Sequence, residues 1–237
     1  MGAGSPSLSV VIMAFNERRT IETQVQYTIA FLKRCAGEYE VVVVDDGSTD
    51  GMGAVADALA RLHRGVKVVH HPRNLGMGVA IRSGYAAATM DFVTQLPGDG
   101  QVHPDTLERF LPHVADHDLV LSTYARRDDG RVRALVTAGY QATAKMLLGD
   151  PCAFTGTLVF RRSLLDGVTL ACDSFMVNVE LPLKLMRLGV RPAYVTIEAL
   201  PRAYGRSKVL SARRVALVVR EMLALRRELV ILSGRAT

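Results

Sequence analysis

Short apolar runs rich in β-branched residues alternate along the chain with segments in which apolar residues recur every three or four positions. The runs suit strands buried on both faces of a sheet, and the longer spacing is typical of amphipathic helices. We expect strands over residues 8–14, 40–45, 66–70, 92–96 and 119–123. We expect helices over about 20–34, 52–63 and 104–114, and a further helix that ends near Thr89.

The pattern changes after Tyr124, where a charged loop over 126–133 leads into an expected helix over 134–148. Further along we expect strands at 157–160 and 190–197, helices at 175–188 and 210–232, and a polar loop at 201–208. Alternating strands and helices with short connections predict an α/β fold. Its sheet should be doubly wound and mostly parallel, with helices on both faces and right-handed crossovers.

The segment Glu40–Gly51 (EVVVVDDGSTDG) combines a run of four valines with two adjacent acids, Asp45 and Asp46. The carboxyl edge of an open α/β sheet is where ligands bind, so carboxylates at this position indicate a binding site. A side chain among residues 48–50 is expected to cap the next helix. Capping alone does not explain the pair of acids, because each raises the cost of ionising the other.

Composition narrows the choice of partner and compartment. The 237 residues include 29 Lys and Arg against 23 Asp and Glu, an excess that suits a phosphorylated ligand or an anionic membrane surface, or only aids solubility. The 3 cysteines show neither metal spacing nor a disulfide pattern, which favours a reducing cytoplasm. We expect no membrane span, since no apolar run reaches roughly 18 residues, and no signal peptide at the N-terminus.

Acidic residues follow three of the expected strands: Glu17 the first, Asp45 and Asp46 the second, and Asp99 the fourth. Parallel strands end at one edge, so these carboxylates should converge on one crevice. Carboxylates can accept hydrogen bonds from a nucleoside and can hold a divalent ion that bridges a diphosphate. The first strand is not followed by the G-x-G-x-x-G of dinucleotide-binding domains, and the chain has no G-x-x-x-x-G-K-[ST], so we predict another kind of nucleotide-plus-metal site.

Five segments occur in a characteristic order: VVIMAFNE, VVVVDDGSTDG, HPRNLGMGVAIRSGY, LPGDGQVHP and PRAYGRSK. Through them the chain resembles family 2 glycosyltransferases of the GT-A fold, above all dolichyl- and polyprenyl-phosphate sugar synthases such as dolichol-phosphate mannose synthase. The resemblance covers nearly the whole chain. It implies a GT-A domain over 1–209, with a loose tail at 1–7, and a basic amphipathic helix over 210–237.

The resemblance also implies a donor, a UDP- or GDP-linked sugar, and the residues that bind it. Glu17, beside Ala14 and Phe15, would contact the nucleoside, and Asp45 and Asp46 would read the base and ribose. The other donor-binding residues implied in this way are Asn74, Gly76, Gly98, Asp99, Arg126, Arg202, Ser207 and Lys208.

The segment LPGDGQVHP resembles a metal-binding sequence that usually reads Asp-X-Asp-X-Gln-His-Pro in the family. Asp99 and Gln101 match its later positions, but Pro97 stands where the first Asp is expected. The resemblance implies a Mg²⁺ or Mn²⁺ ion held by Asp99, Gln101, water and the donor diphosphate, with weaker binding when nucleotide is absent. The alternative is a tight turn without a metal, because turn residues dominate the segment.

The second half of the chain supplies cations. Arg or Lys can stabilise the charge that develops on a leaving diphosphate, and a phosphate acceptor also needs cationic guides. By resemblance, Arg202 and Lys208 are assigned to the leaving diphosphate and Arg133 to the acceptor phosphate. Glu180 resembles a family acid on a helix that faces the site, where it is either a general base for a hydroxyl acceptor or a partner for an Arg.

The last expected helix is amphipathic. Its apolar stripe consists of Val215, Val218, Met222, Leu225, Leu229 and Leu232, and Arg213, Arg220 and Arg227 recur beside it. The helix either packs on the domain or lies on an anionic membrane surface and presents the site to a lipid-linked acceptor. We therefore expect a cytoplasmic protein, which in the second case is peripheral on the inner face of the membrane.

Three functions compete on this evidence. The leading hypothesis is direct inverting transfer of a sugar to polyprenyl phosphate, with Asp99, Glu180, Arg133 and Lys208 as catalytic residues. The alternatives are a soluble glycosyltransferase that acts on a hydroxyl of a small molecule, and a nucleotide-binding partner subunit with little catalysis, which Pro97 would favour. We expect no nucleic-acid partner, because basic and aromatic residues are not interleaved. A homo-oligomer is left open.

Overall fold

The computed structural model of the chain describes residues 6–124, 130–150, 154–197 and 212–235. Within them, one seven-stranded sheet has the strand order β3-β2-β1-β4-β6-β5-β7. The strands are β1 (Leu8–Ala14), β2 (Tyr39–Asp45), β3 (Val66–His70), β4 (Phe92–Pro97), β5 (Leu119–Tyr124), β6 (Phe154–Arg161) and β7 (Ala193–Ile197). The helices are α1 (Ile21–Cys35), α2 (Met52–Leu62), α3 (Met77–Ala87), α4 (Gly130–Leu148), α5 (Val177–Arg187) and α6 (Ala212–Arg235), with short 3-10 helices η1 (Pro104–Arg109), η2 (Leu111–His113) and η3 (Arg162–Gly167).

The sheet is mostly parallel, as predicted. Strands β3, β2, β1 and β4 run parallel to one another, and β5 is parallel to β7. Only β6 among the described strands is antiparallel to both of its neighbours, β4 and β5. The register pairs Ala14 with Asp45 and Met13 with Pro97, so the carboxyl ends of β1, β2 and β4 lie side by side.

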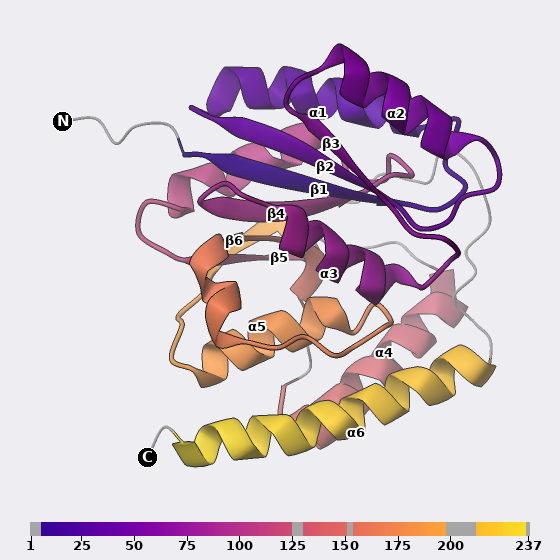
Figure 1. Cartoon of the computed structure of the whole chain (residues 1–237). Helices are drawn as coiled ribbons and strands as arrows, with labels where there is room; N and C mark the ends of the chain where they lie inside the picture. The colour runs from indigo at the N-terminus through magenta and orange to yellow at the C-terminus, as the bar shows by residue number, and fades with distance from the viewer. Residues whose placement is uncertain (1–5, 125–129, 151–153, 198–211, 236–237) are drawn as a thin grey trace.

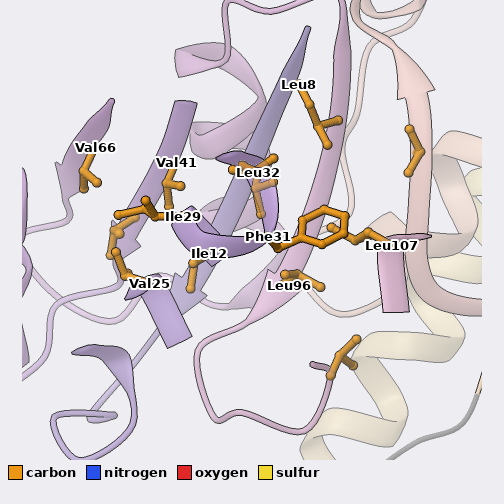
Figure 2. Close-up of a cluster of buried hydrophobic side chains, with 14 of the residues drawn as sticks. Leu8, Ile12, Val25, Ile29, Phe31, Leu32, Val41, Val66, Leu96 and Leu107 are labelled. Carbon is orange, nitrogen blue, oxygen red and sulfur yellow. The ribbon is translucent and has the colours of Figure 1, made fainter. Parts of the chain in front are cut away.

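Helices cover both faces of the sheet (Figure 1). On one face α1, α2 and η1 pack against the strands around Phe31, which is fully buried among Leu8, Leu32, Leu96 and Leu107 (Figure 2). On the other face α3, α4 and α5 bury a second apolar cluster. Helix α6 packs on α4 and α5 and forms the outer layer on this side (Figure 1).

Several element bounds differ from those predicted. The expected helix over 104–114 is replaced by η1 and η2, because Pro112 has no N–H to donate and its ring clashes with the carbonyl four residues earlier. Pro104 starts η1, as expected. Strand β6 begins at Phe154 rather than at residue 157, α5 begins at Val177 rather than at 175, and β7 begins at Ala193 rather than at 190.

The last helix uses only part of its predicted apolar stripe for packing. Met222, Leu225 and Leu229 are buried against the domain, whereas Val215 is 52% exposed. A second set of apolar side chains on α6 faces outward: Leu217, Val219, Leu223, Val230 and Ile231. No helix in the part of the chain that the structure describes is long and apolar enough to cross a membrane.

Candidate active site

The loops at the carboxyl ends of β1 and β2 are joined through Asn16. Its backbone N–H donates to Ser48 Oγ at 2.9 Å, and its side-chain Oδ1 accepts from the Thr49 N–H at 2.8 Å. Asn16 has a positive φ of 57°, a left-handed conformation that Asn adopts more readily than most residues. The turn thereby places Phe15 and Glu17 next to the loop that follows Asp45.

The turn after β4 is joined to the same edge. The Gly98 N–H donates to the Met13 carbonyl at 2.9 Å, and Thr20 Oγ1 donates to the Gly98 carbonyl at 2.7 Å. A side chain at Gly98 would not fit, since an added Cβ would lie 2.8 Å from Ala14 Cβ. Thr20 Oγ1 also lies 3.3 Å from Glu17 Oε2. The turn that carries Asp99 is therefore held against the first loop, as the convergence of strand ends predicted.

Asp45 is buried and organises the loop that follows it. Its Oδ1 accepts from the Ser48 N–H at 2.9 Å, and its Oδ2 lies 3.0 Å from His70 Nδ1. The expected cap of α2 is present in a modified form, because the helix N-cap is Gly51, at φ 87°. The carboxylate of Asp50, one residue before the N-cap, accepts from the Met52 N–H at 3.0 Å. It thereby satisfies a backbone donor in the first turn of the helix.

Asp46 is buried and ties the β2 loop to the loop before α3. One carboxylate oxygen accepts from the Leu75 N–H at 2.9 Å, and the other accepts from the Gly76 N–H at 3.0 Å. His71 Nδ1 lies 2.8 Å from the first of these oxygens. Asp46 therefore shapes the glycine-containing loop that carries Asn74 and Gly76, two of the predicted donor-binding residues.

These contacts give both acids a structural task beside the predicted one. Asp45 and Asp46 are 5% and 4% exposed, and each carboxylate oxygen already has a protein partner. A carboxylate oxygen has two lone pairs, so one acceptor site remains on each oxygen of Asp45. Asp46 keeps one on Oδ2 alone, because its Oδ1 is already paired with both the Leu75 N–H and His71 Nδ1. Reading of the base and ribose by these acids stays a prediction.

His70 is the last residue of β3, and His71 follows it at the same edge. His70 bridges two acids, since its Nε2 lies 2.9 Å from Asp57 Oδ1 and its Nδ1 lies 3.0 Å from Asp45 Oδ2. The hydrogen bond to Asp57, assisted by the one to Asp45, raises the pKa of His70. The positive charge favoured in this way partly offsets the repulsion between the acids at this edge of the sheet.

The predicted metal ligands lie together in the turn after β4. Asp99 is half-buried, and its Oδ1 accepts from the backbone N–H of Gln101 at 3.0 Å. Across the described ranges, no three His, Cys, Asp or Glu side chains gather in a way that could hold a metal ion. One carboxylate and one amide oxygen suit Mg²⁺ or Mn²⁺ when phosphates and water complete the shell, so the donor set is compatible with an ion that arrives with the nucleotide.

Glu180 lies away from solvent. It is 1% exposed, and it accepts from Lys184 Nζ at 2.7 Å and from the backbone N–H groups of Ala171 and Cys172 at 2.8 and 2.9 Å. Within the described residues its ion-pair partner is therefore Lys184, where an Arg was predicted. The geometry favours a positioning role over a general base, because both oxygens are engaged and neither faces an open site.

The structure describes the backbone at only one of the remaining predicted residues, Arg133. Arg133 belongs to the first turns of α4. Arg126, Arg202, Ser207 and Lys208 lie outside the described residues. Asn16, Thr20 and His71, which connect the loops of the site, were not assigned to it from the sequence. For Asn16 a signal was available, because an Asn in the turn after a buried strand tolerates the left-handed conformation better than most residues.

A family model described as "Glycosyl transferase family 2" matches residues 9–168. Among curated proteins, the undecaprenyl-phosphate 4-deoxy-4-formamido-L-arabinose transferase of Pseudomonas fluorescens (strain SBW25) is 27% identical over 218 residues, which are 89% of this chain and 62% of the relative. The protein of the same name from Sodalis glossinidius (strain morsitans) is 30% identical over 168 residues, 68% of this chain and 51% of the relative. The chain thus spans between half and two thirds of the length of these relatives.

Solved structures with the same fold agree with the family model. Glucosyl-3-phosphoglycerate synthase from Mycobacterium tuberculosis, in complex with Mn²⁺, UDP-glucose and phosphoglyceric acid, superposes with a TM-score of 0.68 at 26% identity, and the match covers 97% of this chain and 80% of that one. Mannosyl-3-phosphoglycerate synthase from Rubrobacter xylanophilus gives a TM-score of 0.71 at 22% identity over 94% and 75% of the two chains, which supports the fold alone. With the family model covering well over half of its length, the chain belongs to glycosyl transferase family 2.

Proposed function

We propose that this protein transfers a sugar from a UDP- or GDP-linked donor to a polyprenyl-phosphate acceptor, with inversion at the anomeric carbon. The observation that carries the proposal is the edge at which Glu17, Asp45, Asp46 and Asp99 converge in a chain of this family. The names of the curated relatives support a polyprenyl-phosphate acceptor. The complexes of the M. tuberculosis synthase support a UDP-sugar donor.

The nucleoside of the donor would bind where the loops after β1, β2 and β3 meet. Ala14, Phe15 and Glu17 line the first loop, and Asn74 and Gly76 line the third, which Asp46 holds through the Gly76 N–H. Backbone amides and carboxylates in such loops can recognise a base and a ribose through hydrogen bonds. Gly98, packed against Ala14, would leave room for the diphosphate to pass toward Asp99.

A divalent ion, Mg²⁺ or Mn²⁺, would be held by Asp99 and Gln101 together with the donor diphosphate. When bound, such an ion neutralises charge on the leaving group. The turn itself positions both ligands, because the Asp99 carboxylate accepts from the Gln101 N–H. Mn²⁺ in the M. tuberculosis synthase complex supports the proposal.

The cationic residues of the second half would guide the two phosphate groups. Arg202 and Lys208 would stabilise the leaving diphosphate with Ser207 and Arg126, and Arg133 would bind the acceptor phosphate. A phosphate acceptor is already anionic and needs no general base. A hydroxyl acceptor would require a base. The burial of Glu180 in an ion pair with Lys184 therefore favours a phosphate acceptor over a hydroxyl acceptor.

Helix α6 would contact the membrane that carries such an acceptor. Val219 and Leu223 are exposed on its outer face, and they line a shallow depression there together with Arg220 and Arg227. An apolar strip flanked by arginines suits the surface of an anionic bilayer. The buried part of the predicted stripe packs on the domain, so the contacting face would be this outward one.

Donor choice and catalysis can be tested together. A thermal-shift panel of UDP- and GDP-sugars with and without MnCl₂ identifies the donor, since a ligand of the folded state raises its melting temperature. The selected donor is then tested for sugar transfer to undecaprenyl phosphate. We expect a metal-enhanced shift and formation of a glycosyl phosphate lipid. Nucleotide binding without turnover on lipid or hydroxyl acceptors would contradict the enzyme and favour a nucleotide-binding partner subunit.

The membrane contact needs its own test. Sedimentation with phosphatidylglycerol vesicles should decrease for Arg220→Glu, because the variant places an acid on the proposed contact face. Arg61→Glu, the same charge change on the exposed side of α2, is the control and should sediment like the unmodified protein. Equal sedimentation of both variants would contradict the role of α6.

A further inference from the structure

The C-terminal helix is joined to a short turn, residues 172–174, through one carboxylate. Glu221 Oε1 accepts from the backbone N–H groups of Asp173 and Ser174 at 2.8 and 3.1 Å. The Ser174 hydroxyl donates to the other oxygen, Glu221 Oε2. A single side chain of α6 therefore satisfies three donors of a turn that is 47 or 48 residues away in sequence.

The same turn packs against the start of α3, where the proposed donor site has its glycine-containing loop. The Gly78 N–H donates to the Asp173 carbonyl at 2.9 Å. An added Cβ at Gly78 would lie 2.3 Å from the Cys172 carbonyl oxygen, and one at Gly76 would lie 3.1 Å from the Asp173 carbonyl oxygen. The absence of side chains at both glycines thus allows the two backbones to touch.

Arg82 strengthens this contact from the body of α3. Its guanidinium donates to the Cys172 carbonyl and, through Nη2, to Asp173 Oδ1 at 2.7 Å. From the opposite side, Asp46 accepts from the N–H groups of Leu75 and Gly76. The loop is therefore held between a buried acid of the sheet edge and a turn that is itself held by α6.

A second connection runs parallel to the first. Glu228, one heptad after Glu221, forms an ion pair with Lys184, which also pairs with Glu180. Glu180 in turn accepts from the Ala171 and Cys172 N–H groups, at the beginning of the same turn. Two acids on one face of α6 thus support one segment, whereas the apolar side chains Met222, Leu225 and Leu229 already supply the packing of the helix.

We propose that Glu221 is a positioning residue for donor binding, and that α6 thereby forms part of the support of the donor site. The inference rests on the proposed function, because it assigns the loop around Gly76 to the nucleotide. Loss of the Glu221 carboxylate releases Asp173 and Ser174, and with them the carbonyl that holds the Gly78 N–H. The loop then samples more conformations, and binding has to order it again.

The test compares Glu221→Ala and Glu221→Gln with Arg226→Ala, a change on the same helix whose guanidinium contacts the Met146 carbonyl instead of the turn. Hydrogen exchange of peptides that span residues 75–78 is measured without ligand, and the affinity for UDP and GDP with MnCl₂ is measured by calorimetry. For Glu221→Ala we expect about tenfold faster exchange and about tenfold weaker binding of the nucleotide that the unmodified protein binds. Glu221→Gln keeps an oxygen for both amides, so it should restore most of the loss, and Arg226→Ala should match the unmodified protein.

The outcomes separate this inference from the proposed function. Exchange and affinity in Glu221→Ala that equal those of the unmodified protein overturn the positioning role. Failure of the unmodified protein to bind either nucleotide overturns the proposed function instead. If Glu221→Ala does not fold, Ser174→Ala removes the hydroxyl bond to Glu221 Oε2, together with the bond that Ser174 Oγ accepts from the Met176 N–H, and should still give about threefold weaker binding. An unchanged affinity in that variant also overturns the inference.

Discussion

His71 Nδ1 lies 2.8 Å from Asp46 Oδ1, and His71 Nε2 lies 2.9 Å from Ser83 Oγ. Because an ionised carboxylate only accepts hydrogen bonds, the proton of the ring resides on Nδ1, and a neutral ring accepts from Ser83 at Nε2. Both the imidazole and the carboxylate are buried, at 8% and 5% side-chain exposure. The histidine therefore sets the orientation of the acid that holds the loop before α3.

Replacement of His71 by Ala should weaken this arrangement. The variant removes one donor from a buried carboxylate, which typically costs about 1–3 kcal/mol of unfolding free energy. Urea unfolding measures this loss directly. The matched control is Ser83→Ala, which leaves the bond to Asp46 intact and should cost only about 0.5–1.5 kcal/mol. A midpoint for His71→Ala equal to that of the unmodified protein would show that the ring does not support Asp46.

The pH dependence of stability should reveal His70. Its pKa is raised, first by the hydrogen bond to Asp57 and then by the one to Asp45, so the folded state binds the proton more tightly than the unfolded chain. This contribution is complete below the unfolded pKa of about 6.5, and it is lost as the pH rises through the higher folded-state value. In thermal melts, the melting temperature should decline between roughly pH 5.5 and pH 8.5.

The Asp57→Asn variant is the specific control for His70. It removes the largest cause of the raised pKa, so an NMR titration should give a lower pKa for His70 than in the unmodified protein. The decline in melting temperature should then move to lower pH. A titration of His70 that is identical in the two proteins would contradict the assignment.

Much of the fold follows from local patterns in the sequence. Val41–Val44 are fully buried in β2, as a β-branched run between two helical patterns predicts. The alignment of Ala14 with Asp45 then follows from the parallel arrangement of neighbouring strands. The antiparallel direction of β6 could not be predicted in this way, because an apolar run reads the same in both directions and the chain path through α4 decides it.

The contacts of the site were less accessible to sequence analysis. Which donors satisfy Asp46 depends on a loop 29 and 30 residues away, and no local pattern identifies them. The pair of Glu180 and Lys184 is different, since an acid four residues before a lysine on a helix is a recognisable signal. The resemblance to known transferases implies catalysis by Glu180, whereas its spacing from Lys184 indicates an ion pair.

Replacement of Lys184 by Met should leave the Glu180 carboxylate buried without its cation. Breaking a buried ion pair from one side costs about 3–5 kcal/mol, far more than loss of a surface pair. Chemical unfolding of Lys184→Met tests this value. The double variant Glu180→Gln with Lys184→Met removes both charges and should recover a large part of the loss. A single-variant loss below about 1 kcal/mol would mean that the pair behaves like an exposed one.

Two glycines allow a matched test of the close backbone contact at α3. An added Cβ at Gly78 would lie 2.3 Å from the Cys172 carbonyl oxygen, whereas one at Gly139 in α4 has no heavy atom within 4 Å. Gly78→Ala must therefore displace the turn at 172–174, and we expect a loss of about 1–3 kcal/mol of unfolding free energy, as for other overpacked sites. Gly139→Ala should instead stabilise the protein by about 0.5–1 kcal/mol, because alanine loses less backbone entropy in a helix.

The two alanine variants differ in their effect on the loop as well as on stability. Displacement of the turn also moves the Asp173 carbonyl that accepts from the Gly78 N–H, so hydrogen exchange at residues 75–78 should accelerate in Gly78→Ala and stay unchanged in Gly139→Ala. Stabilisation by both variants would mean that the backbones at α3 and residues 172–174 can separate without cost. Such a result would remove the steric reason for a glycine at position 78.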